Sequence, residues 1–288
     1  MRFSLEIIQN KCYTVICING RLPINITLRN EQLIKEVYSM NTIAERQGKI
    51  VYQDGDTLIK VFDASDWSKS EILTEGLNQA RIEETGLNIP AILKVGTVDG
   101  KWALMMEYIE GKKLSELMAE NPEKMDEYLE LFVSLQKEIH SKKAPLLTTL
   151  KDKMTRKISI ADLKATIRYD LQLKLRELGV TNVVCHCDFK PDNVIITADG
   201  TPYILDWFHT NQGNPNVDAA ITYILFKLDG KDAEAEKYLD LYCEKSAVEK
   251  NAVLKWIPVA AASKSAKTEG AKKEFLLKLA KSVEYLNI

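Results

Sequence analysis

Residues 183–207, with the sequence VVCHCDFKPDNVIITADGTPYILDW, decide the fold of this 288-residue chain. The stretch contains two apolar, β-prone runs, NVIIT and TPYIL, on either side of an Asp-Gly turn, and this pattern predicts a hairpin. Such a hairpin brings Asp188, Asn193 and Asp206 close together. Oxygen-donor side chains at rigid strand ends suit a hard cation such as Mg²⁺. The stretch therefore predicts a magnesium site.

A second hairpin is predicted upstream, where GKIVY and TLIKVF flank another Asp-Gly turn. Lys60 lies in its second strand and shares a face with Leu58 and Phe62 because side chains alternate along a strand. Lys60 is either a lysine that extends from the strand to solvent or one that binds nucleotide phosphates.

A helix is predicted to follow this hairpin, from about Ser68 to Gly86. Its glutamates are available as partners of Lys60; they are Glu71, Glu75, Glu83 and Glu84. We choose Glu75, because helical spacing from Ile72 places it beside the apolar stripe.

Two more strands are predicted within residues 91–110, around a third Asp-Gly turn, Asp99-Gly100. They end in LMMEYIEG, which reads as an edge strand or as a connection that binds a base through main-chain groups. After Gly111 the composition changes to helix formers, and His140 is expected at the C-terminal end of a helix.

The order LIKVF, MMEYI, HCDFKPDN, hairpin and ILDW resembles the kinase pattern H-x-D-x-x-x-x-N followed by D-F-G. With Asp-Trp in place of Asp-Phe-Gly, the chain is similar to the aminoglycoside phosphotransferase and choline kinase family over roughly residues 48–288. The resemblance implies an α+β, bilobal, protein-kinase-like fold with a β-rich N-lobe and a mainly helical C-lobe. We expect a β/α extension packed on the N-lobe (1–47), an N-lobe ending in a nucleotide hinge (48–110), and a C-lobe with the catalytic loop and acceptor site (111–288).

The resemblance also implies ATP and Mg²⁺ as cofactors and gives the motif residues roles. Asp188 is the expected base or orienting group for the acceptor hydroxyl, Lys190 reaches the transferred phosphoryl group, and His186 supports the loop through hydrogen bonds. A histidine base is the alternative. Lys60, paired with Glu75, binds the ATP phosphates. The expected adenine-binding residues are Met106, Glu107 and Ile109, and the expected metal ligands are Asn193 and Asp206.

Three departures from the family pattern stand out. Cys187 occupies a position where glycine is usual, no glycine-rich loop precedes Lys60, and Asn214 replaces the usual aspartate. The run GNPNVDAAITYIL still resembles the family's G-D-P-x-x-D-x-A helix, in which Asp218 either braces the catalytic loop or caps the helix. Cys185 and Cys187 are interpreted as packing residues, because no further Cys or His cluster completes a metal site.

The implied function is ATP- and Mg-dependent phosphorylation of a small-molecule hydroxyl, with aminoglycosides, amino alcohols and sugars as acceptor classes. Polycationic antibiotics would need an acidic cleft, whereas SKSAKTEGAKKEFLLKLAK near the C-terminus is basic. A Ser/Thr protein kinase is one alternative, since Lys190-Pro191 resembles its catalytic loop, but the segment after Asp206-Trp207 is too short for an activation segment. A nucleotide-binding pseudokinase with a regulatory role is the other, and the intact motif residues argue against it.

Composition limits the partners. A net charge of −2 argues against a nucleic-acid partner, and no run approaches the ~20 apolar residues of a membrane helix. The five cysteines form no paired CxxC framework, and the N-terminus lacks a continuous signal-peptide core. The chain is therefore predicted to be cytoplasmic, with a small-molecule partner; its oligomeric state is not predicted.

Overall fold

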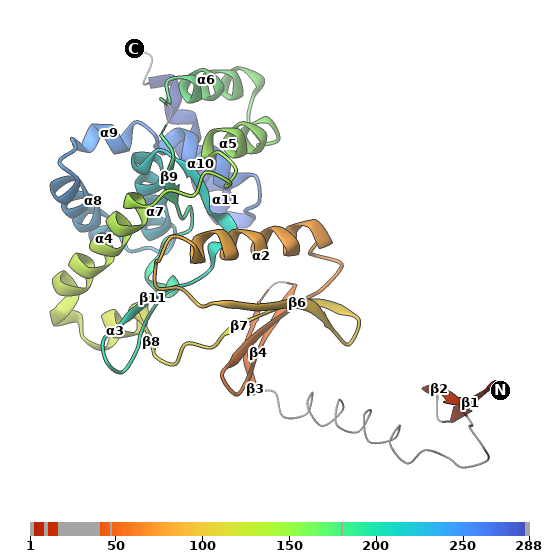
Figure 1. Cartoon of the computed structure of the whole chain (residues 1–288). Coiled ribbons are helices and arrows are strands. Elements are labelled where there is room, and N and C mark those ends of the chain that lie inside the picture. The colour runs from red at the N-terminus through yellow and green to blue at the C-terminus, as the bar shows by residue number, and fades with distance from the viewer. Residues whose placement is uncertain (1–2, 9–10, 17–40, 47, 180, 286–288) are drawn as a thin grey trace.

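The computed structural model describes residues 3–8, 11–16, 41–46, 48–179 and 181–285. A β-rich N-terminal region is followed by a mainly helical C-terminal part (Figure 1). This confirms the predicted α+β arrangement of a β-rich N-lobe and a helical C-lobe.

The N-lobe contains a five-stranded antiparallel sheet in the order β3-β4-β5-β7-β6. Its strands are β3 (Asn41–Arg46), β4 (Lys49–Asp54), β5 (Thr57–Phe62), β6 (Ile92–Val98) and β7 (Lys101–Glu107). Both Asp-Gly hairpins are confirmed, and Gly55 and Gly100 take the positive φ values, 55° and 77°, that glycine tolerates at turns. The sheet begins before residue 48, since β3 comes from the segment assigned to the extension.

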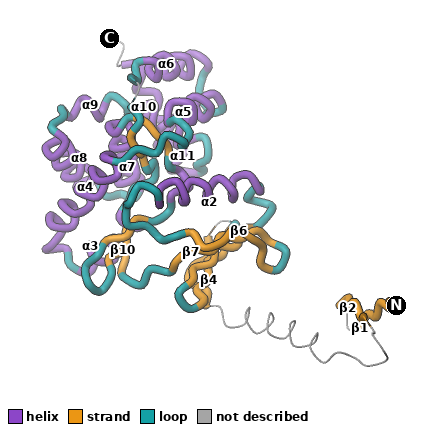
Figure 2. Tube along the Cα trace, in the orientation of Figure 1, coloured by secondary structure: helices purple, strands orange, loops and turns teal. Residues whose placement is uncertain are grey.

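Helix α2 (Lys69–Glu83) connects the sheet to the C-lobe and lies between them in Figure 2. The Ser68 hydroxyl accepts a hydrogen bond from the Glu71 N–H, and the Glu71 carboxylate accepts one from the Ser68 N–H, which closes a capping box. Ile72 packs against the sheet, while Ile82 belongs to the C-lobe core. This helix therefore joins the two lobes through its buried face.

The C-lobe is built around one continuous apolar core. Its helices are α3 (Leu114–Glu120), α4 (Met125–Ser141), α5 (Leu150–Ser159), α6 (Ala165–Arg176), α7 (Pro215–Leu228), α8 (Asp232–Ser246), α9 (Lys250–Leu254), α10 (Ile257–Ser265) and α11 (Gly270–Lys281). The helix-forming stretch 248–262 is divided between α9 and α10, because Pro258 lies in the first turn of a new helix, where its missing N–H does no harm.

The stretch 183–207 forms short strands and tight turns. Strand β9 (Val183–Cys185) precedes the catalytic loop, and the predicted hairpin is β10 (Val194–Ile196) with β11 (Pro202–Ile204). Strand β8 (Lys112–Lys113) pairs with β10 on its other edge. Residues 211–213, Asn-Gln-Gly, have a composition typical of a loop but form β12 (Asn211–Gly213) by pairing with β9.

The N-terminal strands are present as a hairpin, β1 (Phe3–Ile8) with β2 (Lys11–Ile16). The helical part of the expected β/α extension lies outside the described residues, and the packing of the extension on the N-lobe stays a prediction. Within the described ranges, no helix is both long enough and apolar enough to cross a membrane.

Candidate active site

Lys60 and Glu75 form the ion pair that helical spacing predicted. Lys60 projects from the middle of β5, and its Nζ lies 2.8 Å from Glu75 Oε1 on α2. The two side chains are only 14% and 3% exposed, so the pair is held by packing on both sides. A largely buried ion pair of this kind fixes the lysine more firmly than a surface pair does.

The turn between β3 and β4 lies where kinases carry a glycine-rich loop. Gly48 has φ of 67°, and a Cβ added to it would fall 2.4 Å from Asp66 Cβ, so the turn needs glycine here. Lys49 Nζ lies 5.1 Å from the centre of the Trp67 ring, within cation–π range. In place of a glycine-rich loop, this turn has one glycine, Gly48, and one lysine, Lys49. The sequence pattern did not predict a role for either residue.

Asp218 braces the catalytic loop from α7. Its carboxylate accepts hydrogen bonds from the backbone N–H of His186 at 3.0 Å and of Cys187 at 2.7 Å. His140 Nε2 lies 3.0 Å from the same carboxylate, a contact that its expected position at a helix end did not reveal. Burial alone would raise the pKa of Asp218, but the hydrogen bond from His140 keeps that pKa below its ordinary value.

The backbone conformation at Cys187 explains why glycine is usual at this position. Its φ of 64° lies in the left-handed region that favours glycine. Burial and the nearby Asp218 raise the pKa of its thiol to about 12, and Asn211 Nδ2 donates to its sulfur at 3.7 Å. A protonated, buried thiol is unreactive, in agreement with the predicted packing role.

His186 supports the loop, as expected. Its Nε2 lies 2.9 Å from the carbonyl oxygen of Leu205, and its Nδ1 accepts from the Asp188 N–H at 3.3 Å. The ring also packs on Trp207, with 4.6 Å between ring centres. Both ring nitrogens are engaged with the backbone, which makes His186 a positioning residue.

Asp188 and Asn193 face each other across the loop. Asn193 Nδ2 donates to the Asp188 main-chain oxygen at 2.9 Å, with the Asp188 carboxylate 3.4 Å away. Lys190 Nζ lies 3.7 Å from Asp188 Oδ2, and Lys264 Nζ lies 3.1 Å from Oδ1. Burial opposes ionisation of Asp188, but Lys264 and Lys190 keep its pKa below the ordinary value.

Asp206 directly follows Leu205, whose N–H donates to the Asn193 main-chain oxygen at 2.8 Å. Its φ of 63° turns the chain sharply before the 3-10 turn at Trp207–His209. Burial alone would raise its pKa, yet Lys60 and Lys49 hold that pKa well below the usual range. Because Asn193 uses its amide nitrogen toward Asp188, its amide oxygen is the atom available to ligate a metal. An amide oxygen and a carboxylate are ligand types that Mg²⁺ takes, and a magnesium site at Asn193 and Asp206 stays a prediction.

The predicted hinge follows β7. The Tyr108 N–H donates to the Asp56 oxygen at 2.8 Å, and the Glu107 N–H donates to the Ala91 oxygen at 2.8 Å. Met106 and Ile109 are buried, at 5% and 7% exposure. A cavity of about 830 Å³ opens beside this connection, lined by Glu110 to Lys112 and by the β10–β11 hairpin.

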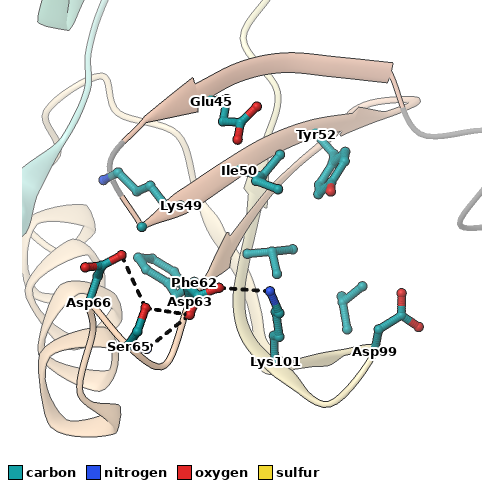
Figure 3. Close-up of a pocket in the computed structure, with 13 residues that line it drawn as sticks. Glu45, Lys49, Ile50, Tyr52, Phe62, Asp63, Ser65, Asp66, Asp99 and Lys101 are labelled. Atoms are coloured by element: carbon teal, nitrogen blue, oxygen red, sulfur yellow. Dashed lines mark hydrogen bonds and ion pairs between the residues drawn. The ribbon is translucent and has the colours of Figure 1, made fainter.

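A separate pocket of about 410 Å³ lies on the face of the sheet opposite Lys60. Figure 3 shows Ile50 and Tyr52 from β4 pointing toward it, with Lys101 at its lower edge in an ion pair with Asp63. It is outside the catalytic loop.

The sequence reading missed several cations near Asp188. Besides Lys264, Lys153 and Lys157 of α5 lie beside His209, and Lys153 Nζ donates to the His209 main-chain oxygen at 2.6 Å. Burial, followed by Lys153, lowers the pKa of His209 to about 3, so the ring is neutral. The only signal was the basic composition of the two segments concerned, because helical periodicity did not show which side chains point inward.

Comparison with known proteins identifies related folds and a family. Residues 46–254 match the phosphotransferase enzyme family. The structure resembles a thermostable mutant of aminoglycoside phosphotransferase APH(4)-Ia at 13% identity and a TM-score of 0.65, covering 89% of this chain and 99% of that one. It also resembles the choline kinase LicA from Streptococcus pneumoniae, at 17% identity and a TM-score of 0.59, with 89% and 99% covered.

A choline/ethanolamine kinase family protein from Mesorhizobium loti is similar at 14% identity and a TM-score of 0.60, covering 89% of this chain and 94% of that one. Other APH(4)-Ia structures are ternary complexes of that enzyme with hygromycin B and ADP or AMP-PNP. No curated protein matches the sequence significantly. The similarity to these solved structures supports the fold, and the match to the family covers most of the chain. The chain therefore belongs to the phosphotransferase enzyme family.

Proposed function

We propose that this phosphotransferase transfers the γ-phosphoryl group of ATP to a hydroxyl group of a small molecule. The observation that carries the proposal is the convergence of Asp188, Asn193 and Asp206 beside the buried Lys60–Glu75 pair. Phosphoryl transfer needs positioned phosphates, neutralised charge and an oriented hydroxyl, and these side chains can supply all three.

In the proposed reaction the acceptor hydroxyl oxygen forms a bond to the γ-phosphorus while the bond from that phosphorus to the β–γ bridging oxygen breaks. ADP leaves with the electron pair of that bond, and the hydroxyl proton passes to the Asp188 carboxylate. Lys190, near Asp188 Oδ2, lies within reach of the moving phosphoryl group. Mg²⁺, held by Asn193 and Asp206, would neutralise charge on the phosphate oxygens.

The nucleotide is assigned to the space between Lys60 and the hinge. Lys60 is fixed by Glu75 to meet the phosphates, and the Glu107 carbonyl and Ile109 N–H are the main-chain groups proposed to bind adenine. Met106 belongs to the N-lobe core with Leu58 and would close the back of this pocket.

A protein-kinase function is less well supported. The segment between Asp206 and the start of α7 at Pro215 consists of a 3-10 turn and β12 paired to β9. It offers no long segment that phosphorylation would reorder.

The buried cysteines Cys185, Cys187 and Cys243 are free, and a reducing cytoplasmic location is part of the proposal.

Nucleotide binding tests the proposal before any acceptor is known. We expect ADP to raise the thermal unfolding temperature more with Mg²⁺ than without it, because the metal joins the phosphates to Asn193 and Asp206. In Asp206→Asn the Mg²⁺ dependence should disappear, while in Lys112→Gln, an exposed lysine of β8, it should persist. A Mg²⁺ effect unchanged in Asp206→Asn would reject the assigned metal site.

A further inference from the structure

A small basic cleft lies next to the catalytic loop. It has a volume of about 190 Å³ and is bounded by α2, α5 and the turn after Asp206. Its positively charged lining residues are Lys153, Arg156, Lys157 and Lys267. The remaining walls are mostly hydroxyl and amide groups, including Thr148, Asn78 and Asn211. A cleft of this composition is suited to an anionic group rather than a cationic one.

Most of this positive charge has no neutralising carboxylate. Among the ion pairs between described residues, Lys267 binds Glu71 at 2.9 Å, but no carboxylate binds Lys153, Arg156 or Lys157. Lys153 donates only to a neutral main-chain oxygen. In a chain with a net charge of −2, Lys153, Arg156 and Lys157 thus gather in one place with no carboxylate paired to them among the described residues.

The cations also lie close enough to repel each other. Burial, together with Lys153 and Lys264, lowers the pKa of Lys157 to about 8. Burial lowers the pKa of Lys153 as well, and Lys264 contributes to this shift. His209, whose main-chain oxygen accepts a hydrogen bond from Lys153, stays neutral and adds no charge. The cost of holding like charges in a partly dry cleft is offset only when an anion enters it.

Lys264 connects this cleft to the reacting end of the site. Its Nζ lies 3.1 Å from Asp188 Oδ1, and its charge acts on both Lys153 and Lys157. The phosphates of ATP are already assigned to Lys60, Asn193 and Asp206, which come from other elements. The cations of α5 and α10 therefore face the hydroxyl that Asp188 would orient.

We propose that the acceptor is an anionic alcohol: a small molecule that carries a phosphate or carboxylate group besides the hydroxyl that is phosphorylated. Its anionic oxygens are bound by Lys153, Arg156, Lys157 and Lys264. This inference rests on the proposed phosphotransferase function and specifies its substrate class. Aminoglycosides and choline, being cations, are repelled by the same cleft.

Titration calorimetry of the full-length protein saturated with Mg·ADP tests the inference, with glycerol 3-phosphate, glycerol and choline as probes. Because the nucleotide site is filled, only the acceptor side remains open to them. We expect glycerol 3-phosphate to bind, and glycerol and choline not to bind at the same concentration. Lys157→Gln and Arg156→Gln should each weaken glycerol 3-phosphate binding about tenfold.

Lys151→Gln is the matched control, since Lys151 is an exposed lysine on the same helix. It should leave glycerol 3-phosphate binding unchanged, and all three variants should bind Mg·ADP as the wild type does. The inference is overturned if glycerol or choline binds as well as glycerol 3-phosphate, or if no probe binds at about 10 mM. It is also overturned if Lys157→Gln weakens ADP binding instead, because the cluster then serves the nucleotide. Failure of the wild type to bind Mg·ADP, measured first, would reject the proposed function itself.

Discussion

Cys187 adopts a left-handed backbone conformation immediately before the proposed catalytic aspartate. This conformation costs a non-glycine residue about 1–2 kcal/mol. Cys187→Gly removes that strain, but it also removes a buried side chain and adds about 0.5–1 kcal/mol of backbone freedom to the unfolded chain. Because these effects oppose each other, we expect the free energy of unfolding, measured in urea, to change by less than about 1 kcal/mol.

Cys185→Gly is the control for this substitution. Cys185 is also fully buried, but it lies in β9 with ordinary strand backbone, so no strain is relieved there. Loss of the buried side chain and of backbone stiffness should lower the free energy of unfolding by about 2 kcal/mol. Equal losses in the two variants would contradict the role given to the left-handed backbone at Cys187.

Motif spacing predicted some of the site residues and missed others for a clear reason. The loop that carries His186 and Asp188 runs directly into the β10–β11 hairpin, and Asn193 and Asp206 flank that hairpin. Their separation in sequence therefore fixes their proximity in space. Lys264 is 76 residues from Asp188, and its contact depends on how α10 packs against the catalytic loop. The sequence shows that the segment around Lys264 is basic. It does not show that the Lys264 side chain points toward Asp188.

Helix α2 carries the partner of the proposed phosphate-binding lysine. Glu75→Gln removes the negative charge that fixes Lys60, so the lysine loses its orientation toward the phosphates. We expect the affinity for Mg·ATP, measured by calorimetry, to fall about tenfold. Glu84→Gln, at the exposed C-terminal end of the same helix, should leave this affinity unchanged. Similar affinities in the two variants would show that the ion pair is not needed for nucleotide binding.

Local signals predicted most elements, and tertiary contacts account for the exceptions. The Asp-Gly turns gave the N-lobe hairpins correctly, because they fix the chain within a few residues. Residues 211–213 have no strand signal and become β12 only because β9 lies beside them. Residues 151–157 are mostly charged and polar, yet they form most of α5, whose buried face consists of Leu150, Met154 and Ile158. These three apolar residues have helical spacing, but the charged residues between them make that pattern hard to recognise in the sequence.

Asp188, Asp206 and Asp218 are buried or half-buried carboxylates on or beside the predicted catalytic loop, and the pKa of each lies below its ordinary value. Burial alone would raise each pKa, but lysines or His140 and backbone N–H groups favour the ionised forms. Since the folded pKa lies below the unfolded one, these groups stabilise the fold above about pH 4, and that contribution is lost as the pH falls further. We expect the thermal unfolding temperature to drop between about pH 5 and pH 3.

Asp218→Asn tests this explanation. It should lower the unfolding temperature at neutral pH and make the acid-induced drop smaller, because one of the responsible carboxylates is gone. Glu127→Gln, which changes an exposed carboxylate on α4, should follow the wild-type profile. If Asp218→Asn and the wild type show the same pH dependence, the buried carboxylate at the brace does not contribute to acid sensitivity.

The small net charge of the whole chain does not reveal that positively charged side chains cluster in one place. The net charge of −2 argues against a nucleic-acid partner, yet Lys153, Arg156, Lys157 and Lys264 gather beside the proposed catalytic carboxylate of Asp188. Total charge averages over the surface, whereas recognition depends on charges within about one Debye length, roughly 10 Å. Only the packing of α5 against α10 brings these side chains together.

Transfer of γ-labelled phosphate from Mg·ATP to small molecules tests the central claim most directly. The panel should pair neutral, anionic and cationic alcohols, and Mg·ADP binding should be measured on the same preparations. We predict that the wild type forms a labelled product and that Asp188→Asn forms it about 10²–10⁴-fold more slowly with nucleotide binding intact. An Asp188→Asn variant as active as the wild type would contradict the account, as would a wild type that binds Mg·ATP but labels no alcohol.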